Sequence, residues 1–168
     1  MNRICLLLCL ALAIPAFGQK FELITGKAFD AALPTNFYLE GNAIPTQKIN
    51  AVMVKTPAGA RALFSLIDTT GYASNITTKY VGMMITEGDL NLCGKKITVG
   101  SYGFGWAKPG TGEDKPGKFS LFDQAGKAVT DCATPRDAKL QQPKPLQIVI
   151  APDGSARLYD GRHYLDLK

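Results

Sequence analysis

Apolar and polar residues alternate along most of the chain, in short segments separated by turn residues. Lys48–Lys55 is a clear example, because Ile49 and Met53 would share one face of a strand, and Val52 and Val54 the other. Side chains of an extended chain alternate between two faces, so this period predicts β-strands. The other predicted strands are Lys20–Thr25, Phe37–Leu39, Lys79–Thr86, Leu90–Cys93, Lys96–Val99 running on into Tyr102–Trp106, Lys118–Phe122, Lys127–Val129, Leu146–Ile150, Ala156–Tyr159 and His163–Leu167.

One segment has two interpretations. Thr56–Gly59 reads as a turn, because proline presets the backbone at its second position and glycine permits positive φ at its fourth. Ala60–Asp68 is then the returning strand, which we favour because both sides of the turn carry similar apolar runs. The alternative is a single short helix near 57–67, with Pro57 in its first turn and Gly71 ending it.

The spacing of these segments predicts an all-β fold. About nine to eleven short strands, with no other stretch of helical period, favour an antiparallel β-sandwich or barrel. Asp160-Gly161 between two alternating segments is the strongest hairpin signal in the chain. The polar, proline-containing segments 108–118 and 133–145 are predicted to be loops at the ends of the sheet.

The first eighteen residues have the pattern of a cleavable secretory signal. Arg3 gives a basic start, Ile4–Ile14 is apolar, Pro15 breaks the helix, and Ala16 and Gly18 are the small residues that precede a cleavage point. The apolar run is shorter than the ~20 residues of a membrane-spanning helix. We therefore predict cleavage after Gly18, a single β-rich domain over 19–168, and a secreted or periplasmic location.

Composition adds only weak constraints. Removal of residues 1–18, in which Arg3 is the only charged side chain, leaves 150 residues with 18 basic and 14 acidic side chains, a net charge of +4. This length suits one domain. The basic residues are scattered, so nucleic-acid binding is not expected. No apolar stretch after residue 18 is long enough for a transmembrane helix.

Two cysteines remain after the predicted cleavage, Cys93 and Cys132. An even number of cysteines in an oxidising compartment predicts a disulfide bond, and two free thiols are the alternative. Two cysteines and one histidine do not supply the ligands of a structural zinc site. No metal site and no cofactor are therefore predicted.

The most unusual stretch is Gly100–Trp106, in which aromatic residues and glycines alternate. In a strand, Tyr102, Phe104 and Trp106 would share one face and the glycines the other. One interpretation is a ligand-binding platform that stacks on a sugar ring or grips an apolar ligand. The other is that the three aromatic side chains fill the core while the glycines relieve crowding. No helix can begin at the proline and glycine that follow, so the glycines do not form a phosphate-binding loop.

No catalytic residue is identified. His163 is the only histidine, and we expect it to be a solvent-facing side chain on the last strand. Paired carboxylates can act as acid and base in glycoside hydrolysis, but only at a defined separation across a cleft. The carboxylates open to this interpretation lie in turn-like or strand segments and are Glu87, Asp89, Glu113, Asp114 and Asp131.

Three functional hypotheses follow. The first is an exported, non-enzymatic module that binds a small molecule, a glycan or a protein. The second is an extracellular hydrolase that uses paired carboxylates. The third is a structural or assembly protein of the cell envelope that pairs through an exposed strand edge. Asn75 also begins a sequence that accepts N-glycosylation, which matters only in a eukaryotic host.

Overall fold

The computed structural model describes residues 20–109 and 115–168. The predicted signal segment, together with Glu113 and Asp114, lies outside these residues. Within them, the chain forms thirteen strands and two short helices, and the strands pair antiparallel. The predicted all-β, antiparallel fold is therefore confirmed, and its layers are those of a sandwich.

The helices are α1 (Lys27–Ala32) and α2 (Ser74–Thr77). The strands are β1 (Glu22–Ile24), β2 (Asn36–Leu39), β3 (Asn42–Lys55), β4 (Arg61–Ile67), β5 (Gly82–Thr86), β6 (Leu90–Leu92), β7 (Lys95–Ile97), β8 (Gly100–Ala107), β9 (Gly117–Asp123), β10 (Ala128–Thr134), β11 (Gln147–Ile150), β12 (Ala156–Asp160) and β13 (His163–Leu167).

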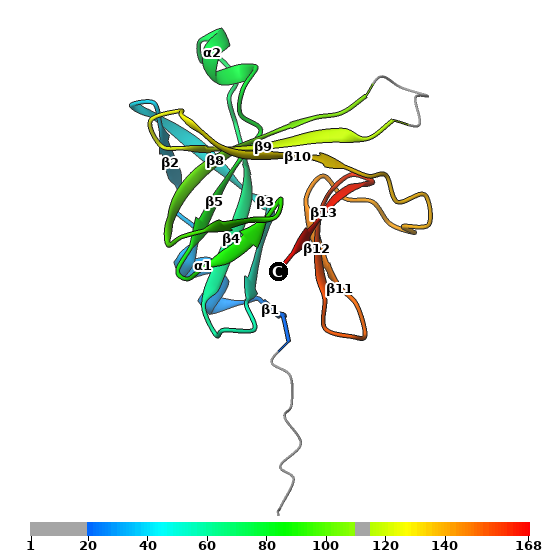
Figure 1. The fold of residues 1–168 in the computed structure, drawn as a ribbon. Coiled ribbons are helices and arrows are strands. Elements are labelled where there is room, and N and C mark those ends of the chain that lie inside the picture. Colours follow the sequence, from blue (N-terminus) through cyan, green and yellow to red (C-terminus); the bar gives the residue numbers. More distant parts are fainter. Residues whose placement is uncertain (1–19, 110–114) are drawn as a thin grey trace, which may run out of the picture.

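A large sheet and a small sheet form the two main layers (Figure 1). The large sheet has the order β1-β3-β4-β5-β8-β9-β10, and β2 pairs with the first half of β3. The small sheet, β11-β12-β13, lies beside it and contacts it through β3 and β10. Two backbone hydrogen bonds join Asn91 of the β6-β7 hairpin to Lys168, the residue after β13.

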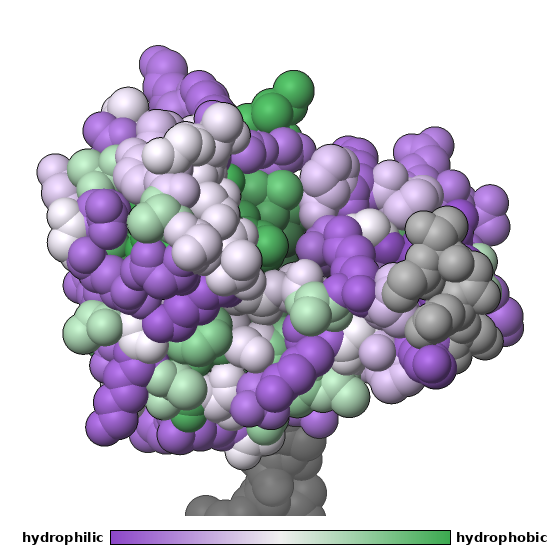
Figure 2. Space-filling model, turned by 90° about the horizontal axis from the view of Figure 1, so that it is seen from above, coloured by the Kyte–Doolittle hydropathy of each residue, from purple (hydrophilic) through white to green (hydrophobic). Residues whose placement is uncertain are grey.

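Both faces of the large sheet are covered. One face packs on the small sheet and the β6-β7 hairpin, and the other is covered by α1, β2 and the segment around α2. Neighbouring residues of β4 therefore point into different cores: Phe64 into the first and Leu63 into the second, with exposed fractions of 0% and 3%. Viewed from above, hydrophilic residues cover most of the surface, and apolar residues show near the middle, between the two halves (Figure 2).

Residues 57–67 contain no helix. Gly59 has φ +88° and donates its N–H to the carbonyl of Thr56, which closes the predicted turn. Arg61–Ile67 then returns as β4, so the strand interpretation is confirmed and the helix alternative is wrong. The segment looked ambiguous because a strand buried on both faces loses its alternation.

The predicted face of Ile49 is also wrong. The pairing of β3 with β4 shifts between Thr46 and Ala51, which indicates a bulge. Within such a bulge the regular alternation of faces is lost. Ile49 lies in this irregular stretch and is 92% exposed, whereas Met53, in the regular part of β3, is 1% exposed.

Neither of the two helices that the structure describes has the length and apolar character that crossing a membrane requires.

Candidate binding site

The aromatic segment lies on β8, between β5 and β9. Phe104 is 0% exposed, Trp106 is 6% exposed, and Tyr102 packs against the same core as a partly buried side chain. Trp106 contacts the edge of Phe119 at a ring separation of 5.3 Å, and its Nε1–H donates to Thr134 Oγ1 at 3.0 Å. Core packing accounts for these positions, and ligand binding by the three side chains stays a prediction.

The opposite face of β8 carries glycines because other parts of the chain approach it closely. A Cβ at Gly105 would overlap the carbonyl oxygen of Lys79, and one at Gly103 would overlap the ring of Tyr80. Glycine permits such approaches because it has no side chain. The alternation of aromatic residues and glycine therefore serves two different packing surfaces of one strand.

A polar network joins three turns above this glycine face. Glu40 accepts hydrogen bonds from Lys79 Nζ at 2.6 Å, from the Tyr80 hydroxyl at 2.7 Å, and from Asn75 at 3.1 Å. Lys79 Nζ also donates to the carbonyl of Gly126 at 2.6 Å. The hydrogen bond from Lys79 is the main reason why the pKa of Glu40 is lowered. All these groups are paired with one another, so the network holds the turns together.

His163 is buried, contrary to the expectation of a solvent-facing side chain. It is 9% exposed, and its Nε2 has no hydrogen-bond partner among the described residues. In the strand register, the backbone of His163 lies opposite that of Asp160 across the β12-β13 turn. The carboxylate of Asp160 forms an ion pair with Lys108 Nζ at 2.5 Å. Burial raises the pKa of Asp160, against the opposing effect of Lys108. This cluster fixes the junction of β13 with the large sheet.

The carboxylates of the hydrolase hypothesis are separately paired. Glu87 bonds to Arg61, Asp89 to Lys96 at 2.7 Å, and Asp131 to Lys118 at 3.5 Å. Glu113 and Asp114 lie outside the described residues. Within residues 20–109 and 115–168, no group of three or more histidine, cysteine or acidic side chains could hold a metal ion.

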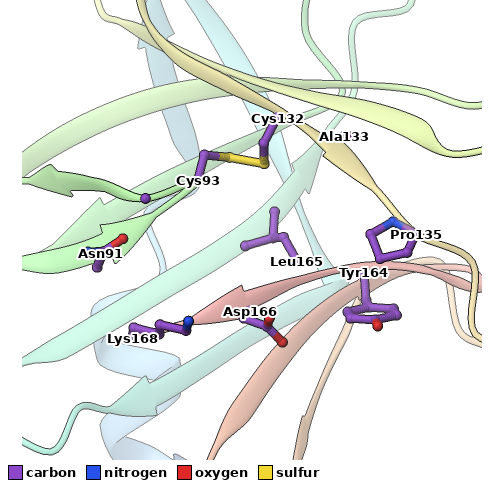
Figure 3. Close-up of a pocket in the computed structure, with 10 residues that line it drawn as sticks. Asn91, Cys93, Cys132, Ala133, Pro135, Tyr164, Leu165, Asp166 and Lys168 are labelled. Carbon is purple, nitrogen blue, oxygen red and sulfur yellow. A yellow bond between two sulfur atoms is a disulfide. The ribbon is translucent and has the colours of Figure 1, made fainter.

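A cavity of about 290 Å³ lies where β10, β13 and the β6-β7 turn meet, and we call it the seam pocket (Figure 3). The predicted disulfide is confirmed: Cys93 at the β6-β7 turn is bonded to Cys132 of β10 at one side of this cavity. The lining residues come from three distant segments and are Asn91, Cys93, Gly94, Cys132, Ala133, Pro135, Tyr164, Leu165, Asp166 and Lys168.

The seam pocket lies beside a gap, a stretch of β13 that, within the described part of the chain, has no hydrogen-bonded strand on one side. Beyond one end of the gap, Tyr164 donates its N–H to the carbonyl of Pro135. At the other end, Lys168 exchanges two backbone hydrogen bonds with Asn91 of β6. Between these points β10 and β13 part, and the cavity occupies the space.

Four of the ten residues around the cavity have polar or charged side chains: Asn91, Tyr164, Asp166 and Lys168. Asp166 Oδ1 accepts a hydrogen bond from Arg157 Nε at 3.0 Å, and the Arg157 guanidinium lies 4.2 Å from the centre of the Tyr164 ring. Asn91 and Lys168 bring an amide and an ammonium group to the opposite end. Donors, acceptors and both signs of charge are therefore available within a small volume, as in sites that orient a small polar ligand.

Sequence reasoning did not identify the seam pocket. It found the two cysteines, but Asn91, Ala133 and Asp166 lie in unremarkable strand segments. Their proximity depends on how the small sheet docks on the edge of the large one, which no local pattern specifies. Comparison with protein-family models, with curated proteins and with solved structures gives no match for this chain.

Proposed function

We propose that this chain is an exported, non-enzymatic binding module and that the seam pocket is its binding site. The observation that carries the proposal is the cavity itself: residues from three segments line it, four of them with polar or charged side chains, and the Cys93–Cys132 disulfide lies at one side. Its volume of about 290 Å³ is near the lower end for small-molecule sites, which span roughly 300–1,000 Å³. The ligand is therefore a small molecule, or a short part of a larger one.

Export is supported by two observations of different kinds. The first eighteen residues follow the pattern of a secretory signal. The disulfide is of the kind that persists in oxidising compartments. A binding role is favoured over hydrolysis because Glu87, Asp89 and Asp131 are each neutralised by a different cation.

The proposal is tested by mapping ligands on the isotope-labelled protein by NMR. Residues 19–168 are titrated with single sugars, amino acids and blocked peptides, and the backbone amide shifts are followed. We expect at least one probe to perturb Asn91, Ala133 and Asp166 together, in a saturable manner.

A matched pair of variants controls for perturbations elsewhere. Ala133 is exposed and lines the cavity, whereas Ala128 is exposed on the same strand away from it. Ala133→Trp is expected to abolish the saturable shifts and Ala128→Trp to leave them unchanged. Equal binding by both variants, or no probe that perturbs the cavity, would overturn the proposal.

A further inference from the structure

We propose that the seam pocket binds a short peptide segment in extended conformation, which pairs with the backbone of Asp166. This inference rests on the proposed function and specifies the ligand class of the same site. It follows from the direction of the backbone groups along β13, from the residues that these groups bond to, and from the length of the gap.

The backbone of Asp166 points away from β12 and into the pocket. Along a strand, the N–H and C=O groups of alternate residues point toward the same neighbour. Tyr164 and Lys168 both direct their N–H groups away from β12, toward Pro135 and Asn91. Asp166 lies two residues from each, so its N–H and C=O point the same way, toward the cavity that it lines.

These two backbone groups have no hydrogen-bond partner on that side among the residues that the structure describes. The register explains why. Arg136 pairs with His163, so an uninterrupted antiparallel ladder would place Ala133 opposite Asp166. Both residues line the cavity instead, because the strands have separated. A donor and an acceptor of β13 are thus exposed between two positions that are already paired.

An extended peptide supplies the complementary groups. Strand addition satisfies an open edge with main-chain hydrogen bonds, so affinity depends little on side-chain identity. The stretch from Tyr164 to Lys168 is about 13 Å long at a rise of roughly 3.3 Å per residue. Pro135 and Asn91 already occupy its two ends, so one peptide residue pairs with Asp166 inside the cavity and the residues on either side of it extend outward.

The disulfide holds the β6-β7 turn and β10, which border the gap, in fixed positions. Cys93 and Cys132 hold the β6-β7 turn against β10 at one side of the cavity. Asn91 of the same hairpin is bonded to Lys168. Both ends of the opening are thereby attached to the rest of the fold, so a peptide enters a preformed site and does not have to pull the sheets apart.

The test uses the tetrapeptide Thr-Val-Thr-Val with an acetylated N-terminus and an amidated C-terminus. The readout is the hydrogen-exchange rate of the Asp166 amide in residues 19–168. At saturation, pairing is expected to slow this exchange by at least about tenfold, since a hydrogen-bonded amide exchanges only when it opens. The same peptide with N-methylated central amides has lost the N–H groups that would pair with the carbonyl of Asp166 and is expected not to bind.

Two variants of Asp166 distinguish the contribution of its backbone N–H to peptide binding from that of its carboxylate. Asp166→Pro removes the N–H that faces the pocket, a change that an edge position tolerates. Asp166→Ala removes the same carboxylate and keeps the N–H. We expect the alanine variant to bind the tetrapeptide and the proline variant to lose binding, which is followed through the amide shifts of Asn91 and Ala133.

The outcomes are distinct. Equal binding of the tetrapeptide and its N-methylated form, or retained binding by Asp166→Pro, would refute backbone pairing. A tetrapeptide without effect, together with a sugar that perturbs the pocket, would refute the peptide and leave the proposed function standing. Failure of every probe would overturn both. If the proline variant does not fold, the comparison with the N-methylated peptide still decides.

Discussion

Trp106 shows how one side chain connects three strands of the large sheet. It extends from β8, packs on Phe119 of β9, and donates its indole N–H to Thr134 at the end of β10. Thr134 is 0% exposed, so water does not replace this hydrogen bond if the hydroxyl is removed. A buried donor left without an acceptor costs about 1–3 kcal/mol.

Thr134→Val is therefore expected to lower the free energy of unfolding by about 1–3 kcal/mol, because it keeps the shape and leaves the indole N–H unpaired. Urea unfolding monitored by far-UV circular dichroism measures the change. Thr25→Val, at an exposed threonine, serves as the control and should change the free energy of unfolding much less. Equal effects of the two substitutions would contradict the assigned role of the hydrogen bond.

Glu40 gives a second prediction at the residue scale, on pH. Its pKa is lowered from an ordinary 4.5, chiefly by the hydrogen bond from Lys79. A carboxylate whose pKa is lower in the folded state stabilises that state above its ordinary pKa, and the stabilisation is lost as the pH falls. Glu40→Gln is expected to unfold with a shallower dependence on pH between about 5 and 3.

Thermal unfolding of the wild type and Glu40→Gln across this pH range provides the measurement. Glu22→Gln, at an exposed carboxylate that lies 3.7 Å from Lys55, is the control. If the Glu40→Gln curve parallels that of the wild type, the network around Glu40 does not contribute to stability in the way proposed.

At the scale of elements, the sequence predicted strands well where one face is buried and turns are marked by glycine. The β12-β13 hairpin at Asp160-Gly161 and the turn at Gly59 are examples. Three features were not predicted from the sequence, for physical reasons. The helix α1 has six residues and α2 has four, too few to display a helical period. The bulge in β3, which leaves Ile49 exposed, has no sequence pattern of its own.

The candidate site was less predictable than the fold. The Cys93–Cys132 bond followed from the number of cysteines, but the cavity beside it depends on the meeting of β6, β10 and β13. Local sequence reports which face of a strand is apolar. It does not report where the strands of two neighbouring sheets separate, and the seam pocket lies where β10 and β13 do so.

The disulfide is the element whose removal should matter most. It joins residues 39 positions apart, and a loop of this length is worth roughly 4 kcal/mol in the chain-entropy model. The double variant Cys93→Ala/Cys132→Ala is expected to lower the free energy of unfolding by about 2–5 kcal/mol. Denaturant unfolding with and without reductant checks this.

Reductant should destabilise the wild type by a similar amount and leave the double variant unaffected. A wild type that alkylates at both cysteines without reduction would show that the bond does not form in the isolated protein.

At the scale of the whole molecule, the two sheets share one core. Leu158 and Leu165 of the small sheet, at 0% and 4% exposed, pack with Phe64 and Phe104 of the large sheet. The small sheet has only three strands and no core of its own. Its stability therefore depends on docking, and the two sheets should unfold together.

Leu158→Ala is expected to lower the free energy of unfolding by about 2–5 kcal/mol. It should do so without splitting the transition. The fluorescence of Trp106, the only tryptophan, reports on the large sheet, and far-UV circular dichroism reports on all strands. Their unfolding curves should coincide in the wild type and in the variant. Two separate transitions would mean that the small sheet is an independent unit.

The docking of the small sheet also bears on how the chain acquires its structure during synthesis. A polypeptide emerges from the ribosome N-terminus first, so Phe64, Phe104 and Phe119 are made well before Leu158 and Leu165 cover them. Both cysteines precede β11, and their bond can form while the apolar face is still open. The last strands therefore dock last, and until they do so the apolar face of the large sheet stays uncovered.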